Sequence, residues 1–236
     1  MSRTLCPHRG HALTYSKCPY HGLTFPVPQG CFKDEGTPVG EFDDLWCEKI
    51  EDDLGAPFFT YDMPVKAPIS LWMQNTMDCN HVTTVHAETF ARVFASTTPI
   101  DVGIGENGSH HSLLVKPEVV EVYKRIIGDG VGNKFFHAVE YPNLSVTSFL
   151  DVFYSFETVK KNSTGCRVTT KFFLSKKNPA PRPLVDAAIE MNKKILLEDR
   201  KIVESWAETY EDVKHVNFLK NEKRIQSYLH SPHCNN

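Results

Sequence analysis

The sequence lacks any long run of hydrophobic residues. Nowhere in its 236 residues does an apolar stretch approach the roughly 20 residues that a membrane-spanning helix needs. The first residues also lack the apolar segment of a secretory signal. We therefore predict a protein without a membrane partner, located in the cytoplasm.

An excess of one charge is missing as well. The 26 Lys and Arg residues nearly balance the 29 Asp and Glu residues, which gives a formal net charge of −3, and no basic block occurs. Nucleic acids and anionic membrane surfaces attract concentrated positive charge. The composition therefore argues against nucleic acid as a partner. A hydrophobic content of 41% with 15 Phe predicts a folded chain of one or two domains.

Internal repeats and a paired set of cysteines are absent too. The chain has 7 Cys, an odd number, and no export signal, so a disulfide framework is not expected. Metal binding or burial is the better expectation for these thiols. The one G-x-G-x-x-G pattern, Gly103-Ile-Gly105-Glu-Asn-Gly108, is followed by Ser109-His-His-Ser and not by an amphipathic helical run, so a nicotinamide or flavin site within the chain is not expected.

Two Cys and two His crowd into sixteen positions near the N-terminus, as Cys6-Pro-His8 and Cys18-Pro-Tyr-His21-Gly22. Converging thiols and imidazoles indicate a metal site. Zinc accepts such a set, but zinc fingers usually take two Cys from one loop and two His from another. Here each loop supplies one Cys and one His, which suits a [2Fe–2S] cluster with two His ligands on one iron. Structural zinc is the alternative.

A second pattern, N-x-x-D-x-x-H-x₄-H, comprises Asn75, Asp78, His81 and His86. Two residues five apart lie about 140° apart on an ideal helix, so both histidines face one ion only if a helix ends or bulges between them. Asp78 and His81, three apart, share a face. Taken alone, the two histidines are more typical of residues that cap a helix or form hydrogen bonds in a core than of metal ligands.

A carboxylate would complete a site with two histidines, because that set leaves open positions on ferrous iron. The pattern over residues 184–211 predicts a helix. Asp199 lies in the middle of its apolar stripe, where an unpaired carboxylate is costly unless a metal or cation offsets it. Glu198, rotated by about 100°, is the poorer candidate. The stripe contains Ile195, Leu196, Ile202, Val203 and Trp206.

The pattern of residues in the middle of the chain predicts β-strands, and the predicted long helix follows them. The segments are β-branched and aromatic, a turn is expected at Lys160–Gly165, and Pro117–Ile127 predicts a helix with Pro in its first turn. The Pro64 and Pro68 stretch marks a domain boundary. We predict an α+β fold, in which an antiparallel sheet grips a helix around a substrate pocket. The predicted strands are Leu144–Leu150, Val152–Val159 and Cys166–Leu174.

The cluster motif, the iron motif, the hairpins and the carboxylate helix, in this order, resemble the Rieske non-haem iron oxygenases, although the chain is unusually short. The resemblance implies a small all-β Rieske [2Fe–2S] domain in residues 1–62 and a helix-grip catalytic domain in residues 63–236. It also implies that Cys6 and Cys18 bind one iron of the cluster, and that His8 and His21 bind the other. Residues 23–61 must then support the cluster, with a small core expected from their aromatic and aliphatic side chains, Phe42, Ile50, Phe58 and Phe59 among them.

By the same resemblance, His81, His86 and Asp199 bind a mononuclear Fe(II), Asp78 bridges a cluster histidine to an iron histidine, and Asn75 lies near the iron. The implied activity is mono- or dioxygenation, using O₂ to hydroxylate or oxidatively demethylate a small organic, possibly aromatic, substrate. A ferredoxin or flavin-dependent reductase would supply two electrons. The implied assembly is a head-to-tail homotrimer, in which the bridge joins neighbouring subunits.

A rival hypothesis belongs to another class. The chain would be a Rieske electron carrier or a non-catalytic binding module whose iron site is vestigial. Intact iron-site residues argue against this hypothesis, because a carrier does not need them. Cys79 and the pair His110 and His111 are not expected to be ligands; a strand or surface loop is the favoured interpretation of the histidine pair.

Overall fold

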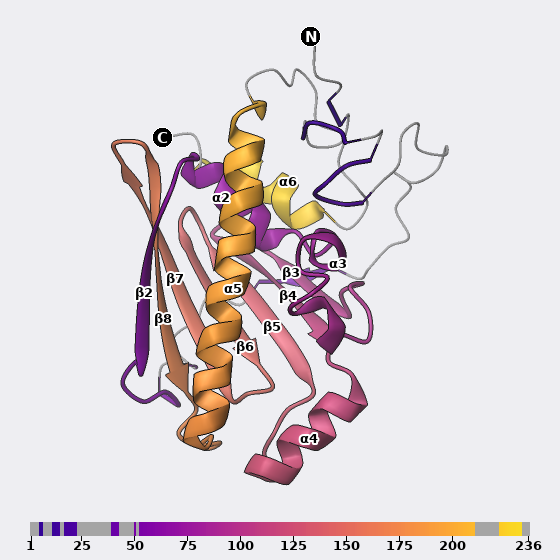
Figure 1. Ribbon diagram of the computed structural model, residues 1–236, viewed down its shortest axis with the longest axis vertical. Coiled ribbons are helices and arrows are strands. Elements are labelled where there is room, and N and C mark those ends of the chain that lie inside the picture. The colour runs from indigo at the N-terminus through magenta and orange to yellow at the C-terminus, as the bar shows by residue number, and fades with distance from the viewer. Residues whose placement is uncertain are drawn as a thin grey trace.

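An eight-stranded sheet carries the fold (Figure 1). The computed structural model describes residues 5–6, 11–14, 17–22, 39–42, 50, 52–210 and 222–232. The strand order is β1-β3-β4-β5-β6-β7-β8-β2, and all neighbours pair antiparallel except β1 with β3. The strands are β1 (Val39–Glu41), β2 (Phe59–Val65), β3 (Asp101–Ile104), β4 (Gly108–Leu114), β5 (Lys134–Glu140), β6 (Leu144–Phe149), β7 (Phe153–Asn162) and β8 (Gly165–Leu174).

One long helix, α5 (Arg182–Ala207), runs across one face of this sheet (Figure 1). Its buried side chains are Val185, Leu196, Asp199, Val203 and Trp206, which confirms the apolar stripe around Asp199. The other helices are α2 (Ile69–Met77), α3 (Val82–Val85), the 3₁₀ turn η1 (Ala91–Val93), α4 (Pro117–Ile127) and α6 (Lys223–His230). The α+β fold with a sheet gripping a helix is therefore confirmed.

The predicted elements of the hairpins and helices are present. Strand β7 continues to Asn162, three residues beyond its predicted end, because the turn to β8 occupies only residues 163–164. Helix α4 has its predicted bounds, with Pro117 in its first turn. Helix α5 begins two residues before its predicted start and ends four residues earlier than predicted.

The segment expected to support the cluster contributes to the large sheet. Strand β1 pairs with β3, and β2 pairs with β8. Phe42 and Ile50 pack with Ala138 and Val146, whereas Phe58 and Phe59 pack against the core beneath α5. The described side chains of the predicted small core therefore cover the sheet. The predicted boundary at residues 62 and 63 falls inside β2, and the division into two domains stays a prediction.

Two hydrophobic clusters hold α5 on the sheet. The first joins α2, β2, β8, α6 and the C-terminal half of α5 around Trp72 and Trp206. The second joins α4, the 3₁₀ turn, several strands and the start of α5 around Leu113 and Leu150. Within the described ranges, no helix is both long and apolar enough to cross a membrane.

Candidate metal centre

Three buried ligand atoms converge between α3 and α5. The Nε2 atoms of His81 and His86 are 3.2 Å apart, and Oδ1 of Asp199 lies 3.3 Å from the first and 3.1 Å from the second. Ligands about 2.1 Å from one ion are about 3.0 Å apart on the face of an octahedron and about 3.4 Å apart in a tetrahedron. The triangle therefore has the size of three ligands on one metal ion, with further positions open. We call these three residues, the predicted iron ligands, the iron triad.

A short helix brings the two histidines together. Helix α3 has only four residues; His81 lies immediately before it, and His86 ends it, with the His86 backbone N–H donating to Val82 O. The prediction that a helix end separates the two histidines is confirmed. Each ring therefore leaves the helix at a different end, which removes the about 140° separation of a continuous helix.

The second nitrogen of each ring fixes which nitrogen faces the ion. His81 Nδ1 donates to Asp78 O at 2.5 Å, and His86 Nδ1 donates to Glu198 Oε2 at 2.8 Å. Since both acceptors are oxygens, Nδ1 carries a proton in each ring, which leaves Nε2 as the nitrogen that would bind an ion once any further proton is displaced. Glu198, which sequence analysis considered only as a poorer ligand, thus orients His86. Thr89 donates to the same oxygen at 2.8 Å.

The charges of the iron triad also suit a cation. Burial disfavours a charged His86, but the nearby Asp199 and Glu198 outweigh it and raise the His86 pKa to about 9. Burial likewise disfavours a charged Asp199, yet His86 and His81 hold its pKa far below the ordinary value. The same two carboxylates would also favour a metal ion in the place of this proton.

Asn75 lies beside the triad, as predicted. Its Nδ2 donates to Asp199 Oδ1 at 2.8 Å from helix α2, and its side chain is 1% exposed. This bond holds the carboxylate toward the histidines. Within the described part of the chain, the buried Oδ1 of Asn75 receives no hydrogen bond, which leaves an acceptor close to the proposed ion for a water molecule or substrate.

Cys6 and Cys18 of the predicted cluster lie together in a buried pocket. They are 1% and 0% exposed and pack with Tyr20. The contact with Cys6, followed by burial, raises the pKa of the Cys18 thiol, whereas hydrogen bonds from the backbone of His21 and Tyr20 lower it. Such backbone N–H groups stabilise thiolate sulfur in iron–sulfur sites. The chemistry of these donors fits a cluster; the predicted ligand His8 lies outside the described residues.

The second cluster loop reaches the iron triad through Asp78. His21 Nε2 donates to Asp78 Oδ2 at 2.9 Å, and the backbone carbonyl of the same Asp78 accepts the proton of His81. Gly22 follows with φ of +69°, the left-handed turn that its position predicts. Glu222, at the start of α6, places Oε1 4.0 Å from His21 Nε2. We call His21, Asp78 and Glu222 the bridge group.

Aromatic rings pack the cluster loop onto the triad. The Tyr20 ring stacks on His81 with centroids 5.1 Å apart and an interplanar angle of 1°, and it also contacts Trp206 of α5. Within one chain, Asp78 and Tyr20 therefore connect the loop that carries the predicted cluster ligands Cys18 and His21 to the predicted iron ligand His81.

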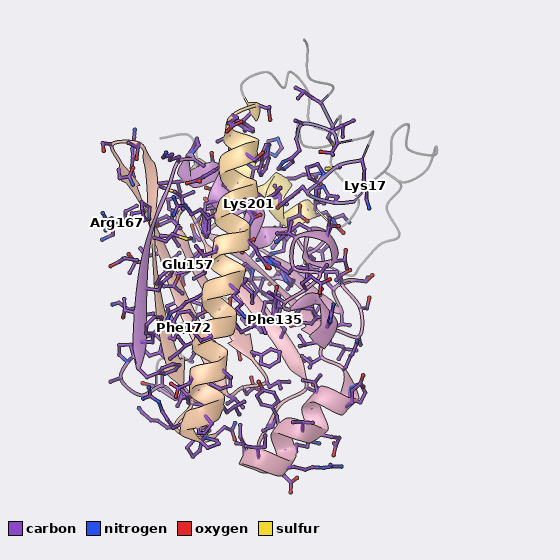
Figure 2. All side chains as sticks on the ribbon, in the orientation of Figure 1. Lys17, Phe135, Glu157, Arg167, Phe172 and Lys201 are labelled. Atoms are coloured by element: carbon purple, nitrogen blue, oxygen red, sulfur yellow. The ribbon has the colours of Figure 1, made fainter. Side chains whose placement is uncertain are left out.

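A cavity of about 320 Å³ opens from the triad between α5 and the sheet. Side chains that sequence analysis did not select line it, including Glu157 (labelled in Figure 2), His111 and His137. Arg224 of α6 lies behind the two histidines. The apolar spacing of Ile225, Tyr228 and Leu229 is a helical signal that would have revealed α6; nothing local marks Glu157, because its neighbours come from other strands.

Arg224 fixes both cavity histidines as neutral rings. It is 2% exposed and contacts Nδ1 of His111 and, at 3.2 Å, Nδ1 of His137. Burial, followed by the Arg224 charge, holds the pKa of both histidines well below the ordinary value. Because a guanidinium only donates, each ring carries its proton on Nε2. His111 Nε2 lies 3.4 Å from Cys79 Sγ.

In sequence, no protein-family model and no curated protein matches the chain. In structure, it is similar to a quaternary ammonium Rieske monooxygenase of carnitine oxidation by gut microbiota, a protein with inter-subunit electron transfer. The TM-score is 0.60 at 14% identity, and the match covers 96% of this chain and 76% of that chain. It is also similar to dicamba monooxygenase bound to dicamba, with a TM-score of 0.55, 15% identity, and coverage of 95% and 82%. The chain therefore has the fold of Rieske oxygenases.

Proposed function

We propose that the protein is a Rieske-type oxygenase that hydroxylates or oxidatively demethylates a small organic substrate. The observation that carries the proposal is the iron triad, whose two Nε2 atoms and one carboxylate oxygen converge at 3.1–3.3 Å beside a cavity of about 320 Å³. Two His and one carboxylate are the ligand set of oxygenases that activate O₂ at non-haem Fe(II). The fold similarity to two Rieske monooxygenases supports the same activity.

His81, His86 and Asp199 would hold Fe(II), and Cys6, His8, Cys18 and His21 would hold the [2Fe–2S] cluster. The iron would supply O₂ activation, with two electrons from a ferredoxin or flavin-dependent reductase. Glu198 and the Asp78 carbonyl keep the ring protons on Nδ1, and Asn75 holds the carboxylate. Since His21 Nε2 donates to Asp78, the other ring nitrogen, Nδ1, is the one that would bind the cluster.

Asp78 is proposed as the coupling residue between the two centres. Its side chain accepts from His21 and its carbonyl accepts from His81, all within one chain. The resemblance implies a bridge between subunits of a homotrimer, whereas these contacts permit coupling without a second subunit. Co-assembly of a Cys18→Ser chain with an Asp199→Ala chain tests the difference, because activity returns only if electrons pass between subunits.

Metal analysis and single turnover test the proposed function. The oxygenase predicts three irons per chain, two in the cluster and one in the triad, together with a Rieske-type EPR signal. An electron carrier predicts two irons, and a zinc protein predicts neither the EPR signal nor visible absorption. Chemically reduced protein is then exposed to O₂ with a substrate panel. Two irons per chain, or no oxygenated product from any substrate, would contradict the proposal.

A further inference from the structure

The floor of the cavity changes in polarity from one row of side chains to the next. Cross-strand pairing defines three rows that line the cavity across β4 to β8. The first is apolar, the second is polar and neutral, and the third contains a carboxyl group. The rows are Leu113, Phe135, Phe149 and Phe153; His111, His137, Thr147 and Ser155; and Ser145, Glu157 and Thr170.

Glu157 is held in the third row by neutral groups. Trp72 Nε1 donates to Oε1 at 2.6 Å, Thr170 Oγ1 donates to Oε2 at 3.4 Å, and Ser145 adds a hydrogen bond. The residue is 7% exposed, and no Lys or Arg is among the described residues that line the cavity. A buried carboxylate without a cationic partner is costly, and a bound cation would offset that cost.

The other acids and the histidines that line the cavity already have partners. Asp199 faces His81 and His86, and Asp78 faces His21. His111 and His137 are kept neutral by Arg224, so the second row presents hydrogen-bond donors without a charge. Glu157 is therefore the acidic group of the described lining that faces the cavity without a cation beside it.

We propose that the cavity binds a small organic cation with an apolar portion. Its ammonium group lies against Glu157, and its apolar portion lies over the first, apolar row, which includes Phe135. Both residues are labelled in Figure 2. Trp72, which holds the Glu157 carboxylate, belongs to α2, so the charged end of the ligand lies at the α2 side of the floor. This inference rests on the proposed function, because it assigns the substrate class of the same cavity.

Matched pairs of ligands test the charge requirement. Choline is compared with 3,3-dimethylbutan-1-ol, its neutral carbon isostere, and benzylamine with benzyl alcohol, by calorimetry on the iron-loaded full chain without O₂. The wild-type protein is expected to bind at least one cation about tenfold more tightly than its neutral partner. Glu157→Gln, which keeps the shape and an acceptor for Trp72, is expected to remove that preference.

Two control variants isolate the charge of Glu157. Thr170→Val removes a hydrogen bond to the carboxylate but keeps the charge, so both affinities change while the cation should still bind more tightly than its neutral partner. Glu118→Gln removes an exposed carboxylate on α4 and should leave both affinities unchanged. Iron is present in every sample, so its charge does not distinguish Glu157→Gln from the wild type.

The proposal is overturned if neither cation binds, if the neutral partners bind as tightly, or if Glu157→Gln retains the preference. Should Glu157→Gln fail to fold, the wild-type and Thr170→Val comparisons still decide the matter. Binding is measured without turnover, so failure here is distinct from failure of the oxygenase proposal, which metal content and single turnover decide.

Discussion

The iron triad and the bridge group are two neighbouring buried groups of histidines and carboxylates. They differ in whether the ring nitrogen that faces the carboxylate donates a proton or is available to a metal ion. In the iron triad, two Nε2 lone pairs and one carboxylate oxygen face one point. In the bridge group, a single Nε2 proton of His21 faces the carboxylates of Asp78 and Glu222 at 2.9 and 4.0 Å. Both groups bring potential ligand atoms within 4.8 Å of one another.

The difference arises from the hydrogen bonds behind the rings. Oxygen acceptors hold the protons of His81 and His86 on Nδ1, so Nε2 is a metal ligand in both. The Nε2 of His21 instead donates to Asp78, so this atom carries a proton and does not bind a metal. Residue types and proximity therefore do not define a metal site; the protonation of the facing atoms does.

Removing the carboxylate of the triad should have the largest effect. Asp199→Ala leaves two histidines for the ion and removes the negative charge that offsets its burial, so we expect the mononuclear iron and all oxygenation to be lost. Iron analysis should fall from three to two per chain, with an unchanged cluster EPR signal. An unchanged iron content would sink the assignment of Asp199 as a ligand.

Breaking the bridge should preserve both metals but uncouple them. Asp78→Asn keeps the backbone carbonyl that orients His81 and weakens the charge-assisted bond from His21. We expect about 100-fold slower cluster oxidation in a single turnover, at unchanged iron content. Normal single-turnover electron transfer in this variant would rule out the bridging role.

The three residues of the proposed triad can be selected from the sequence because their signals are local. The spacing of His81 and His86, and the position of Asp199 on an apolar helix face, each need only a few turns of chain. The bridge group and the cavity are harder to predict. Glu222 precedes α6 and Arg224 belongs to it, and sequence analysis missed this helix. Glu157 becomes a cavity residue only through its pairing with Ser145 and Thr170. Such contacts depend on strand register, which a single sequence does not specify.

Glu157 is a fourth buried acid, besides Asp78, Asp199 and Glu222. Its titration should change the stability of the protein in the opposite sense to that of a carboxylate paired with a cation. Burial, opposed by the bond from Trp72 and aided by Asp199, raises its pKa from 4.5 to about 7. Between these values the folded state binds more protons than the unfolded state, so the free energy of unfolding falls as pH rises. Glu157→Gln removes this loss.

The free energy of unfolding of Glu157→Gln, relative to the wild type, should therefore increase by ~3 kcal/mol between pH 4.5 and pH 8. Urea denaturation at several pH values measures the difference. The exposed variant Glu118→Gln should show no comparable trend. A difference between Glu157→Gln and the wild type that does not change with pH would mean that Glu157 is not a strained buried acid.

Removing the charge of Glu198, the carboxylate that orients His86, should have a smaller effect, which added Fe(II) reverses. Glu198→Gln retains an acceptor for His86 Nδ1 but loses the charge that strengthens the bond and raises the basicity of Nε2. We expect metal affinity to fall about 10- to 100-fold, with the site refilled by excess Fe(II). Glu222→Gln makes the same change in the bridge group and should leave the triad's affinity unaltered. If both variants lost metal affinity equally, then the negative charge near the triad, and not the hydrogen bond that holds the proton on His86 Nδ1, would determine that affinity.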